Sequence, residues 1–372
     1  MSFPMRFCDE CFKSKQIKDI IQSGNEKGNC ELNPTHKNVF ICDTNENEEI
    51  TLYVKDFLRQ IIELYEVVSE LPDDFPSAKT KLIKDSLKND WPIFEIESEK
   101  IYNLLSYLFD GNSDLDTRVL DSPVGIIEDM NTESHHLLIS GNNDWDAFIE
   151  EITYENRFHQ KLMNNKTLEH FISKSYDVID PTDKKYFRSR ISNDKNLELA
   201  EMSAPPKGKA KSGRLNSELI SVLYLSDDIE TTWQEVRAAF HDTVYTGTFG
   251  ISKDKLIVAN LCNDFQLRVF DNSKDEEYLK YYLNKNILEK ITFELTKPTN
   301  EYTKSKNYIP LQYVSDFIKA HRLNFDGILY SSVMKKGKKN LLLFDPSLAK
   351  CIQLEKSTVK EVRYSASEIQ SY

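Results

Sequence analysis

Residues 212–235 read SGRLNSELISVLYLSDDIETTWQE, and this segment combines a turn, a strand and a helix. A glycine-containing turn comes first, the short apolar run 222–225 follows, and a helical pattern begins at Ile229. Short β-like runs lie on both sides of the segment, and few helical patterns interrupt them. Strands clustered in this way with few helices indicate an α+β domain.

Working outward, the period of the apolar residues predicts the elements after residue 175. The predicted strands are 176–179, 186–191, 222–225, 244–251, 255–261, 327–330, 341–344 and 359–364. The predicted helices are 229–240, 276–295 and 311–321. Before residue 175 the patterns are mostly helical, at 51–70, from Ser98 onward, at 144–152 and at 167–172. We therefore expect a mainly helical block followed by an α+β domain.

The composition is that of a globular protein. The 372 residues include 40% hydrophobic and 29% charged residues, too much apolar mass for a disordered chain. The formal charge is −12, which argues against broad electrostatic binding of nucleic acid or anionic lipid. No apolar run approaches the ~20 residues that a membrane span needs, and MSFPMRFCDE contains no secretory signal. We expect a soluble, cytoplasmic protein with no membrane partner.

Four of the six cysteines crowd the first 42 residues and predict a metal site. Cys8 and Cys11 form a CxxC pair, and Cys30 follows nineteen positions later. Thiolates at this spacing can hold one Zn²⁺ when a distant turn completes the tetrahedron. The alternative is a redox-active or incidental CxxC, but the βαβ context of a redox motif is missing. We favour zinc with a structural role.

The fourth zinc ligand is either His36 or Cys42. His36 lies in the turn-rich stretch NPTHK, whereas Cys42 ends the strand-like run NVFIC. A turn offers a ligand more easily than a strand does. We therefore predict that Cys8, Cys11, Cys30 and His36 bind the metal, with Cys42 as the alternative.

Six polar residues stand in separated motifs of the C-terminal half. They are Arg188 in YFRSR, Arg214 and Asn216 in SGRLN, Tyr224 in VLYLS, Glu235 in TWQEV and Ser332 in FDGILYSS, with Ser331 as the neighbouring alternative to Ser332. Taken singly, each fits a structural role, such as a core position for Tyr224 or a surface position for Glu235. Their joint occurrence in this order favours a site.

In this order the motifs resemble the RES-domain family, named for an Arg, a Glu and a Ser, over roughly residues 175–350. The cysteine knuckle and helical block further resemble the HEPN/RES N-terminal architecture. That pattern often has a second CxxC, whereas CELN at 30–33 lacks the second Cys. The resemblance implies a zinc-binding knuckle at 1–45, a helical HEPN/RES N-terminal-like domain at 46–174 and a RES domain with an ADP-ribosyltransferase-like fold at 175–372. A HEPN-type nuclease is not indicated, because no Arg of the helical block has a His at the usual spacing.

What the resemblance implies for function is an NAD⁺-consuming toxin or immune effector of the NAD⁺ glycohydrolase type. It assigns catalysis to Arg188, Arg214, Tyr224, Glu235 and Ser332, and NAD⁺ binding to Arg188, Arg214, Asn216, Tyr224 and Ser332. Many relatives are toxins held by an antitoxin, so an antitoxin or another regulatory protein is a candidate partner. Oligomerisation stays open, and nucleic acid is a disfavoured partner.

The chemistry of these residue types is consistent with that implication. A guanidinium binds diphosphate oxygens bidentately, which suits Arg188 or Arg214. Loss of nicotinamide leaves an oxocarbenium-like ribose, and a carboxylate such as Glu235 stabilises that charge. A Tyr ring can stack on nicotinamide, and a Ser hydroxyl can hold ribose or amide. None of these steps requires a metal.

Two alternative functions remain open at this point. The first is an ADP-ribosyltransferase that modifies a protein or nucleic acid. The second is a catalytically silent interaction module in which the zinc knuckle and the helices bind a regulator. Retention of all the motif residues argues against the silent module.

Overall fold

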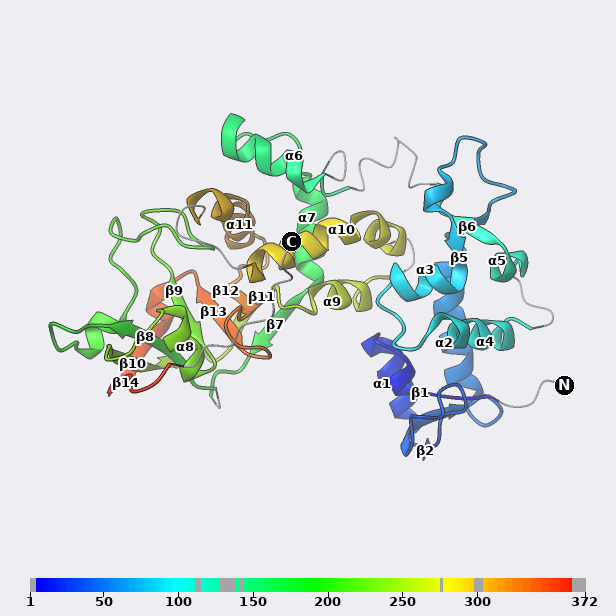
Figure 1. Ribbon diagram of the computed structural model, residues 1–372, viewed down its shortest axis with the longest axis horizontal. Helices are drawn as coiled ribbons and strands as arrows, with labels where there is room; N and C mark the ends of the chain where they lie inside the picture. The colour runs from blue at the N-terminus through cyan, green and yellow to red at the C-terminus, as the bar shows by residue number, and fades with distance from the viewer. Residues whose placement is uncertain are drawn as a thin grey trace, which may run out of the picture. The chain divides into compact units, whose positions relative to one another are not determined.

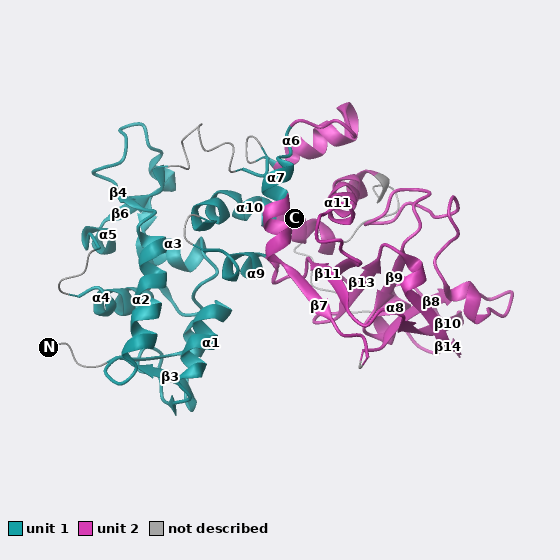
Figure 2. Ribbon diagram, turned by 180° about the vertical axis from the view of Figure 1, so that it is seen from behind, with its two compact units in different colours: residues 1–144, 162–168, 266–288 teal, residues 145–161, 169–265, 289–372 magenta. Residues whose placement is uncertain are grey.

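The computed structural model describes residues 5–110, 115–127, 138–140, 144–182, 184–274, 277–297 and 304–362 (Figure 1). The chain divides into two compact units, and both are discontinuous in sequence (Figure 2). Unit 1 consists of residues 1–144, 162–168 and 266–288, and unit 2 of residues 145–161, 169–265 and 289–372.

Unit 1 is mostly helical and contains two small sheets. Its helices are α1 (Lys15–Ser23), α2 (Glu48–Ile62), α3 (Ile83–Asn89), α4 (Ser98–Leu108), α5 (Arg118–Asp121), nearly all of α9 (Phe265–Asp271) and the first part of α10 (Glu277–Thr296). Its strands are β1 (Arg6–Cys8), β2 (Lys27–Gly28), β3 (Val39–Asp43), β4 (Glu66–Val67), β5 (Lys81–Leu82) and β6 (Pro123–Gly125). They form three-stranded sheets in the orders β1-β3-β2 and β4-β6-β5.

An aromatic core joins distant segments of unit 1. The buried Trp91 ring stacks on Tyr281 and Tyr282, with centroid distances of 5.9 and 5.6 Å. Ser14 Oγ donates a hydrogen bond to Asp271 Oδ1 at 2.7 Å. Residues 266–288 therefore belong to the core of unit 1, although the segments directly before and after them in the sequence belong to unit 2.

Unit 2 is built on an eight-stranded sheet in the order β14-β10-β8-β9-β13-β12-β11-β7. Only β11 and β12 pair in parallel; all other described pairs are antiparallel. The strands are β7 (Tyr176–Ile179), β8 (Tyr186–Ile191), β9 (Leu223–Ser226), β10 (Thr243–Ile251), β11 (Leu256–Asn260), β12 (Gly327–Ser331), β13 (Lys339–Leu343) and β14 (Ala349–Thr358). The helices are α6 (Trp145–Glu150), continued by a π-helix (Glu151–Glu155), α8 (Ile229–Glu235), α11 (Lys304–Lys319) and parts of α7 (Asn165–Lys174) and α10.

A hydrophobic core lies against this sheet. Fully buried Leu223, Leu256 and Leu341 come from three different strands and belong to one cluster. Helix α8 contacts β8, β9 and β10. Because α8 is short and held by three strands, its last residue, Glu235, has a defined place beside the sheet.

The α+β class predicted from the sequence is confirmed, but the last predicted strand and the end of the helix predicted at 229–240 were wrong. Residues 359–362 are not a strand, and residues 363 and 364 lie outside the described part; the last strand is β14. As an edge strand β14 pairs only with β10 and stays largely exposed, so it needs no apolar alternation. The helix predicted at 229–240 ends at Glu235, because Arg237 adopts a left-handed φ of 54°.

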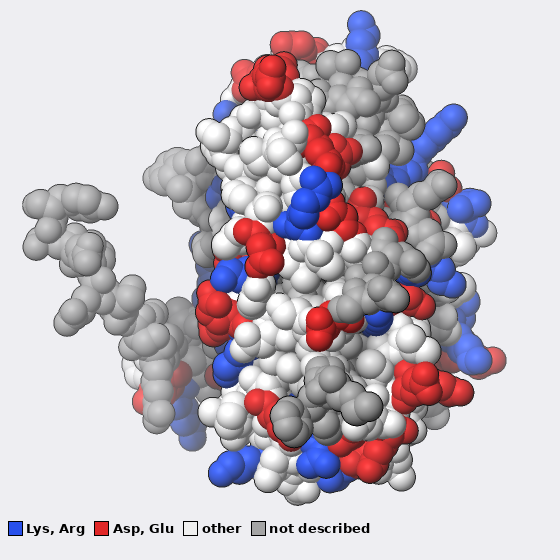
Figure 3. Space-filling view, turned by 90° about the vertical axis from the view of Figure 1, so that its right-hand side faces the viewer, with Lys and Arg blue, Asp and Glu red and all other residues white. Residues whose placement is uncertain are grey.

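Other helices also differ from the prediction. Helix α2 ends at Ile62 rather than near residue 70, and α11 begins at Lys304, well before 311, with Pro310 inside it. No helix in the described ranges is long and apolar enough to cross a membrane. On the face shown in Figure 3, acidic and basic side chains of the described residues are interspersed.

Candidate functional sites

The sheet of unit 2 is split between β8 and β9. These strands share a single residue pair, Phe187 with Ser226, whereas β8 forms six pairs with β10. Beyond that pair, Arg188 and Ser189 of β8 line a cavity together with Tyr224 and Leu225 of β9. The cavity has a volume of about 650 Å³. The cavity therefore lies where β8 and β9 diverge, with residues of both strands in its walls.

The other walls come from segments distant in sequence. Helix α8 contributes Thr232 and Glu235, and the turn before β9 contributes Ser212, Gly213 and Arg214. Tyr308 of α11, Tyr330 at the end of β12, Val333 and Met334 of the following loop, and Asn340 of β13 complete them. Three tyrosines, a carboxylate and three guanidinium groups (Arg188, Arg214 and Arg237) therefore line one cavity.

Glu235 is the carboxylate of this cavity. Its Oε1 accepts a hydrogen bond from Asn340 Nδ2 at 3.0 Å. Burial of the carboxyl raises its pKa, and the Asn340 hydrogen bond and the charge of Arg214 oppose that rise. The residue keeps access to solvent, so a ligand can reach it. Asn340 thus favours the ionised form of Glu235.

Buried polar contacts hold α8 on the sheet. Ser189 Oγ lies 2.6 Å from Thr232 Oγ1 and 2.9 Å from Thr246 Oγ1. Trp233 Nε1 donates to the same Thr246 hydroxyl at 2.8 Å. Since these groups are satisfied and mostly buried, they fix the rotation of α8 and hence the side on which Glu235 lies.

Arg188 is half-buried and lacks a carboxylate partner among the described residues. Its Nη1 donates to the carbonyls of Ser203 at 2.8 Å and Met202 at 3.3 Å. Desolvation and the neighbouring Arg190 lower the pKa of Arg188 to about 10, so it stays cationic at neutral pH. A desolvated cation on a cavity wall is suited to an anionic ligand.

Arg214 also lines the cavity, and it anchors a helix. Its Nη1 donates to the carbonyls of Glu294, Leu295 and Lys297 at 2.8–3.0 Å. These carbonyls lie at the C-terminus of α10, where a cation is favourable. The guanidinium also lies 5.5 Å from the centre of the Tyr308 ring. Helix α10 therefore fixes the position of Arg214.

Tyr224 and Asn216 form a rigid pair behind the turn. The Tyr224 hydroxyl donates to Asn216 Oδ1 at 2.9 Å and accepts from the Leu215 N–H at 3.1 Å. Asn216 is buried and does not line the cavity, whereas Tyr224 does. Gly213 packs against both, since a Cβ there would lie 2.3 Å from Asn216 Oδ1 and 2.8 Å from the Tyr224 hydroxyl. Asn216 thus acts on the cavity through Tyr224.

Neither predicted serine lines the cavity. Ser332 Oγ accepts the Met334 N–H at 3.1 Å, and Ser331 Oγ accepts the Asn263 N–H at 3.1 Å. The next residues, Val333 and Met334, do line it. Ser332 thus shapes the loop that forms this wall.

Asn340, Tyr308 and Tyr330 were not among the predicted site residues. Asn340 is the first residue of the apolar run NLLLF. A polar residue at the start of a buried strand was the one sign in the sequence that Asn340 could belong to the site. Burial of the Tyr330 hydroxyl raises its pKa well above the usual value. Tyr308 lies in α11, but the helix predicted from the sequence began only at residue 311, so Tyr308 fell outside it.

A second candidate site lies in the N-terminal segment of unit 1. Cys8, Cys11, Cys30 and His36 present ligand atoms that all lie within 4.8 Å of one another. Cys8 Sγ is 3.5 Å from Cys11 Sγ and 3.2 Å from His36 Nδ1. Cys11 Sγ is 3.6 Å from Cys30 Sγ. Sulfurs around a tetrahedral Zn²⁺ are separated by roughly 3.8 Å, so the cluster fits such an ion.

The surroundings of the cluster also suit a metal. The Asn33 N–H donates to Cys30 Sγ at 3.2 Å, which stabilises a thiolate. Cys42 is directed elsewhere, with its Sγ 3.4 Å from Thr51 Oγ1. Of the two alternatives for the fourth position, the structure places His36 in the cluster.

Comparison with known proteins identifies the cavity-bearing region. Residues 188–366 match the model of the RES domain family, and this range includes Arg188, Arg214, Tyr224, Glu235 and Asn340. No curated protein and no solved structure matches the chain. The matched region covers most of β8, all of β9 and α8, and the loop after β12, so the chain contains a RES domain.

Proposed function

We propose that the RES domain binds NAD⁺ between β8 and β9 and cleaves the bond between nicotinamide and ribose. At the level of the family, a RES domain supports an NAD-related, toxin-like function. The observation that carries the proposal is the cavity itself, where Glu235 and three guanidinium groups line one volume of about 650 Å³. A carboxylate beside cationic groups suits a ligand with a diphosphate and a reacting sugar.

In this proposal the arginines bind the diphosphate of NAD⁺, and the carboxylate of Glu235 takes part in the cleavage. Arg188 and Arg214 bind diphosphate oxygens, and the end of α10 holds Arg214 in position for this. The ring of Tyr224 offers a stacking surface for nicotinamide. Ser332 acts indirectly, by shaping the loop that contains Val333 and Met334. Asn216 also acts indirectly, by holding the hydroxyl of Tyr224.

Cleavage then needs stabilisation of positive charge on the ribose. The bond from C1′ to nicotinamide breaks, the bonding electron pair leaves with the neutral nicotinamide, and C1′ becomes oxocarbenium-like. Ionised Glu235 stabilises that cation. Water adds to C1′ and loses a proton, so the products are ADP-ribose, nicotinamide and H⁺. A transferase differs only in the acceptor that replaces water.

Incubation of the purified protein with NAD⁺, followed by chromatography of the products, tests this proposal. Free nicotinamide and ADP-ribose in equal amounts support a glycohydrolase. Nicotinamide together with ADP-ribosylated protein or nucleic acid supports the transferase instead. Intact NAD⁺ after incubation with the full chain contradicts the proposal and favours the silent module.

Removal of the Asn340 amide should change the pH dependence of this reaction. Asn340→Leu keeps a similar volume but deletes the donor to Glu235, so the pKa of Glu235 rises further above its usual value. Because the ionised form is active, the acid limb of the kcat/KM profile should move to higher pH, with activity recovered above it. An acid limb at the wild-type pH would show that Asn340 does not tune Glu235.

We further propose that Cys8, Cys11, Cys30 and His36 bind a structural Zn²⁺. All four tetrahedral positions are then filled by protein, so the ion stabilises the fold of this segment rather than binding substrate. The division into a knuckle at 1–45, a helical part at 46–174 and the RES part also stays a proposal.

Replacement of Cys8 by Ser should release the metal. Wild-type protein should contain about one zinc per chain by mass spectrometry, and Cys8→Ser close to none. Cys42→Ser is the matched control, because Cys42 is equally buried but lies outside the cluster. Metal-free wild type, or equal loss of metal in both variants, would contradict the assignment.

A further inference from the structure

The loop between β12 and β13 forms one wall of the Glu235 cavity. Val333 and Met334 line the cavity, and the Met334 N–H donates to Ser332 Oγ. The Ser332 N–H donates to the Lys338 carbonyl at 2.8 Å, which closes the loop. The first residues of the loop therefore line the cavity, and the lysines of the loop come directly after them in the sequence.

The loop carries a cluster of positive charges. The sequence 335–339 reads KKGKK, so four cations lie within five residues. Like charges at such spacing repel one another. An anionic group beside the loop therefore offsets this repulsion.

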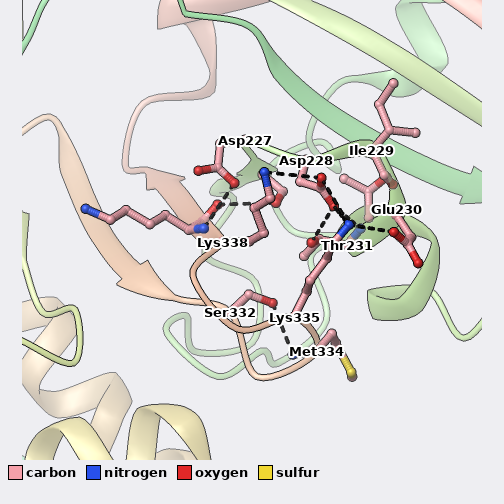
Figure 4. A network of polar contacts seen from close by, with 12 residues as sticks. Asp227, Asp228, Ile229, Glu230, Thr231, Ser332, Met334, Lys335 and Lys338 are labelled. Carbon is pink, nitrogen blue, oxygen red and sulfur yellow. Dashed lines mark hydrogen bonds and ion pairs between the residues drawn. The ribbon is translucent and has the colours of Figure 1, made fainter.

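Asp228 is that group (Figure 4). Its Oδ2 lies 3.3 Å from Lys335 Nζ, and its Oδ1 lies 3.5 Å from Lys338 Nζ. The same carboxylate accepts the N–H and the hydroxyl of Thr231, both at 2.9 Å, and so caps the N-terminus of α8. Asp228 thus contacts both the loop and the helix that ends at Glu235.

The ion pairs around Asp228 form a network. Lys335 Nζ also lies 2.5 Å from Glu230 Oε2 in the first turn of α8. Burial opposes ionisation of Asp228, but hydrogen bonds from Thr231 and Lys335 outweigh it and hold the pKa at about 2. Its side chain is only 16% exposed, so solvent screens these pairs less than pairs on an open surface.

We propose that Asp228 is a positioning residue of the candidate active site, which holds the β12–β13 loop against α8 through Lys335 and Lys338. The substrate in this inference rests on the proposed function, whereas the clamp itself does not. A loop held in place lets NAD⁺ bind without first ordering that wall, and release of the clamp lowers affinity.

The variant Asp228→Asn separates the clamp from the helix cap. Asn keeps a side-chain oxygen for the Thr231 N–H and is an equally good N-cap, but it carries no charge for the lysines. Asp227→Asn is the matched control. Asp227 Oδ1 accepts the Lys339 N–H at 3.0 Å, and Asp227 forms no ion pair within the described ranges. The amide oxygen of Asn can make the same contact.

Two measurements are made on each variant. Hydrogen exchange of residues 332–338 reports loop opening directly. NAD⁺ affinity is measured by calorimetry in a Glu235→Gln background, where the ligand is not consumed. For Asp228→Asn we expect faster exchange in this loop, unchanged exchange in α8 and a roughly three- to tenfold higher Kd. Asp227→Asn should resemble the parent protein.

Unchanged loop exchange in Asp228→Asn would overturn the clamp. Faster exchange with unchanged affinity would overturn the positioning role. Faster exchange in α8 as well would mean that the cap, not the clamp, had been lost, and would also count against the inference. If the parent protein does not bind NAD⁺, the proposed function fails, and the clamp then stands or falls on the exchange result alone.

Discussion

Replacement of Glu235 by Gln is expected to slow the release of nicotinamide from NAD⁺ by at least about 10²-fold. Gln keeps the oxygen that accepts from Asn340 Nδ2, so the cavity wall is retained. It removes the negative charge that we assign to stabilisation of the ribose cation. Because that cation exists only near the transition state, kcat should fall while KM changes little.

The control for this variant is Glu218→Gln. Glu218 is exposed and does not line the cavity, so the same chemical change there should leave the rate within about twofold of wild type. Thermal unfolding should be similar for all three proteins. A Glu235→Gln variant that retains wild-type kcat would remove Glu235 from catalysis.

Local patterns in the sequence were sufficient for much of the sheet. The strands β7 and β8 have the predicted boundaries, because Tyr176–Ile179 and Tyr186–Ile191 carry dense apolar and β-branched or aromatic side chains. The edge strand β14 was missed, since Ala349–Thr358 pairs on one side only and keeps many polar side chains. A strand is predicted from the alternation of apolar and polar residues, and that alternation arises only where one face of the strand is buried. The edge strand β14 is mostly exposed and therefore lacks it.

The candidate sites show the same division between local and distant information. The Cys₃His cluster follows from a CxxC pair and a turn, both local patterns. Asn340 lies 105 residues from Glu235 in the chain, and no pattern in either segment indicates their contact. Arg214 was expected to bind phosphate, and its contacts with the end of α10 depend on packing that a motif does not describe.

The roles of Tyr224 and Asn216 illustrate why motif order was informative while individual roles were not. Both residues occur in the expected motifs, yet Asn216 is buried behind Tyr224 and fixes its hydroxyl. A motif therefore records residues that build a site together with residues that touch its ligand. Only the structure separates the two groups.

A second large effect is expected at Gly327, the first residue of β12. Gly327 pairs with Val258 on one side and Leu343 on the other, so its strand is flanked on both sides. A Cβ at this position would lie 1.9 Å from the Leu342 carbonyl oxygen and 3.0 Å from its carbon. Both are backbone atoms, which cannot move without displacing β13.

Gly327→Ala should therefore destabilise unit 2 by about 3 kcal/mol or more, through overpacking and lost strand pairing. In a unit of this size such a loss corresponds to a fall in Tm of at least about 6 °C, measurable by calorimetry. Gly250→Ala in β10 is the matched control. Its Cβ would meet only the side chain of Ile352, at 3.3 Å, and Ile352 is 63% exposed and free to turn away.

The comparison of these two glycines also tests the placement of the cavity. Strand β13 carries Asn340, the partner of Glu235, and β12 leads into the loop with Met334. If Gly327→Ala displaces β13, NAD⁺ cleavage should fall together with Tm, whereas Gly250→Ala should preserve both. A Gly327→Ala protein that melts within about 2 °C of wild type would show that β12 and β13 do not approach as closely as described.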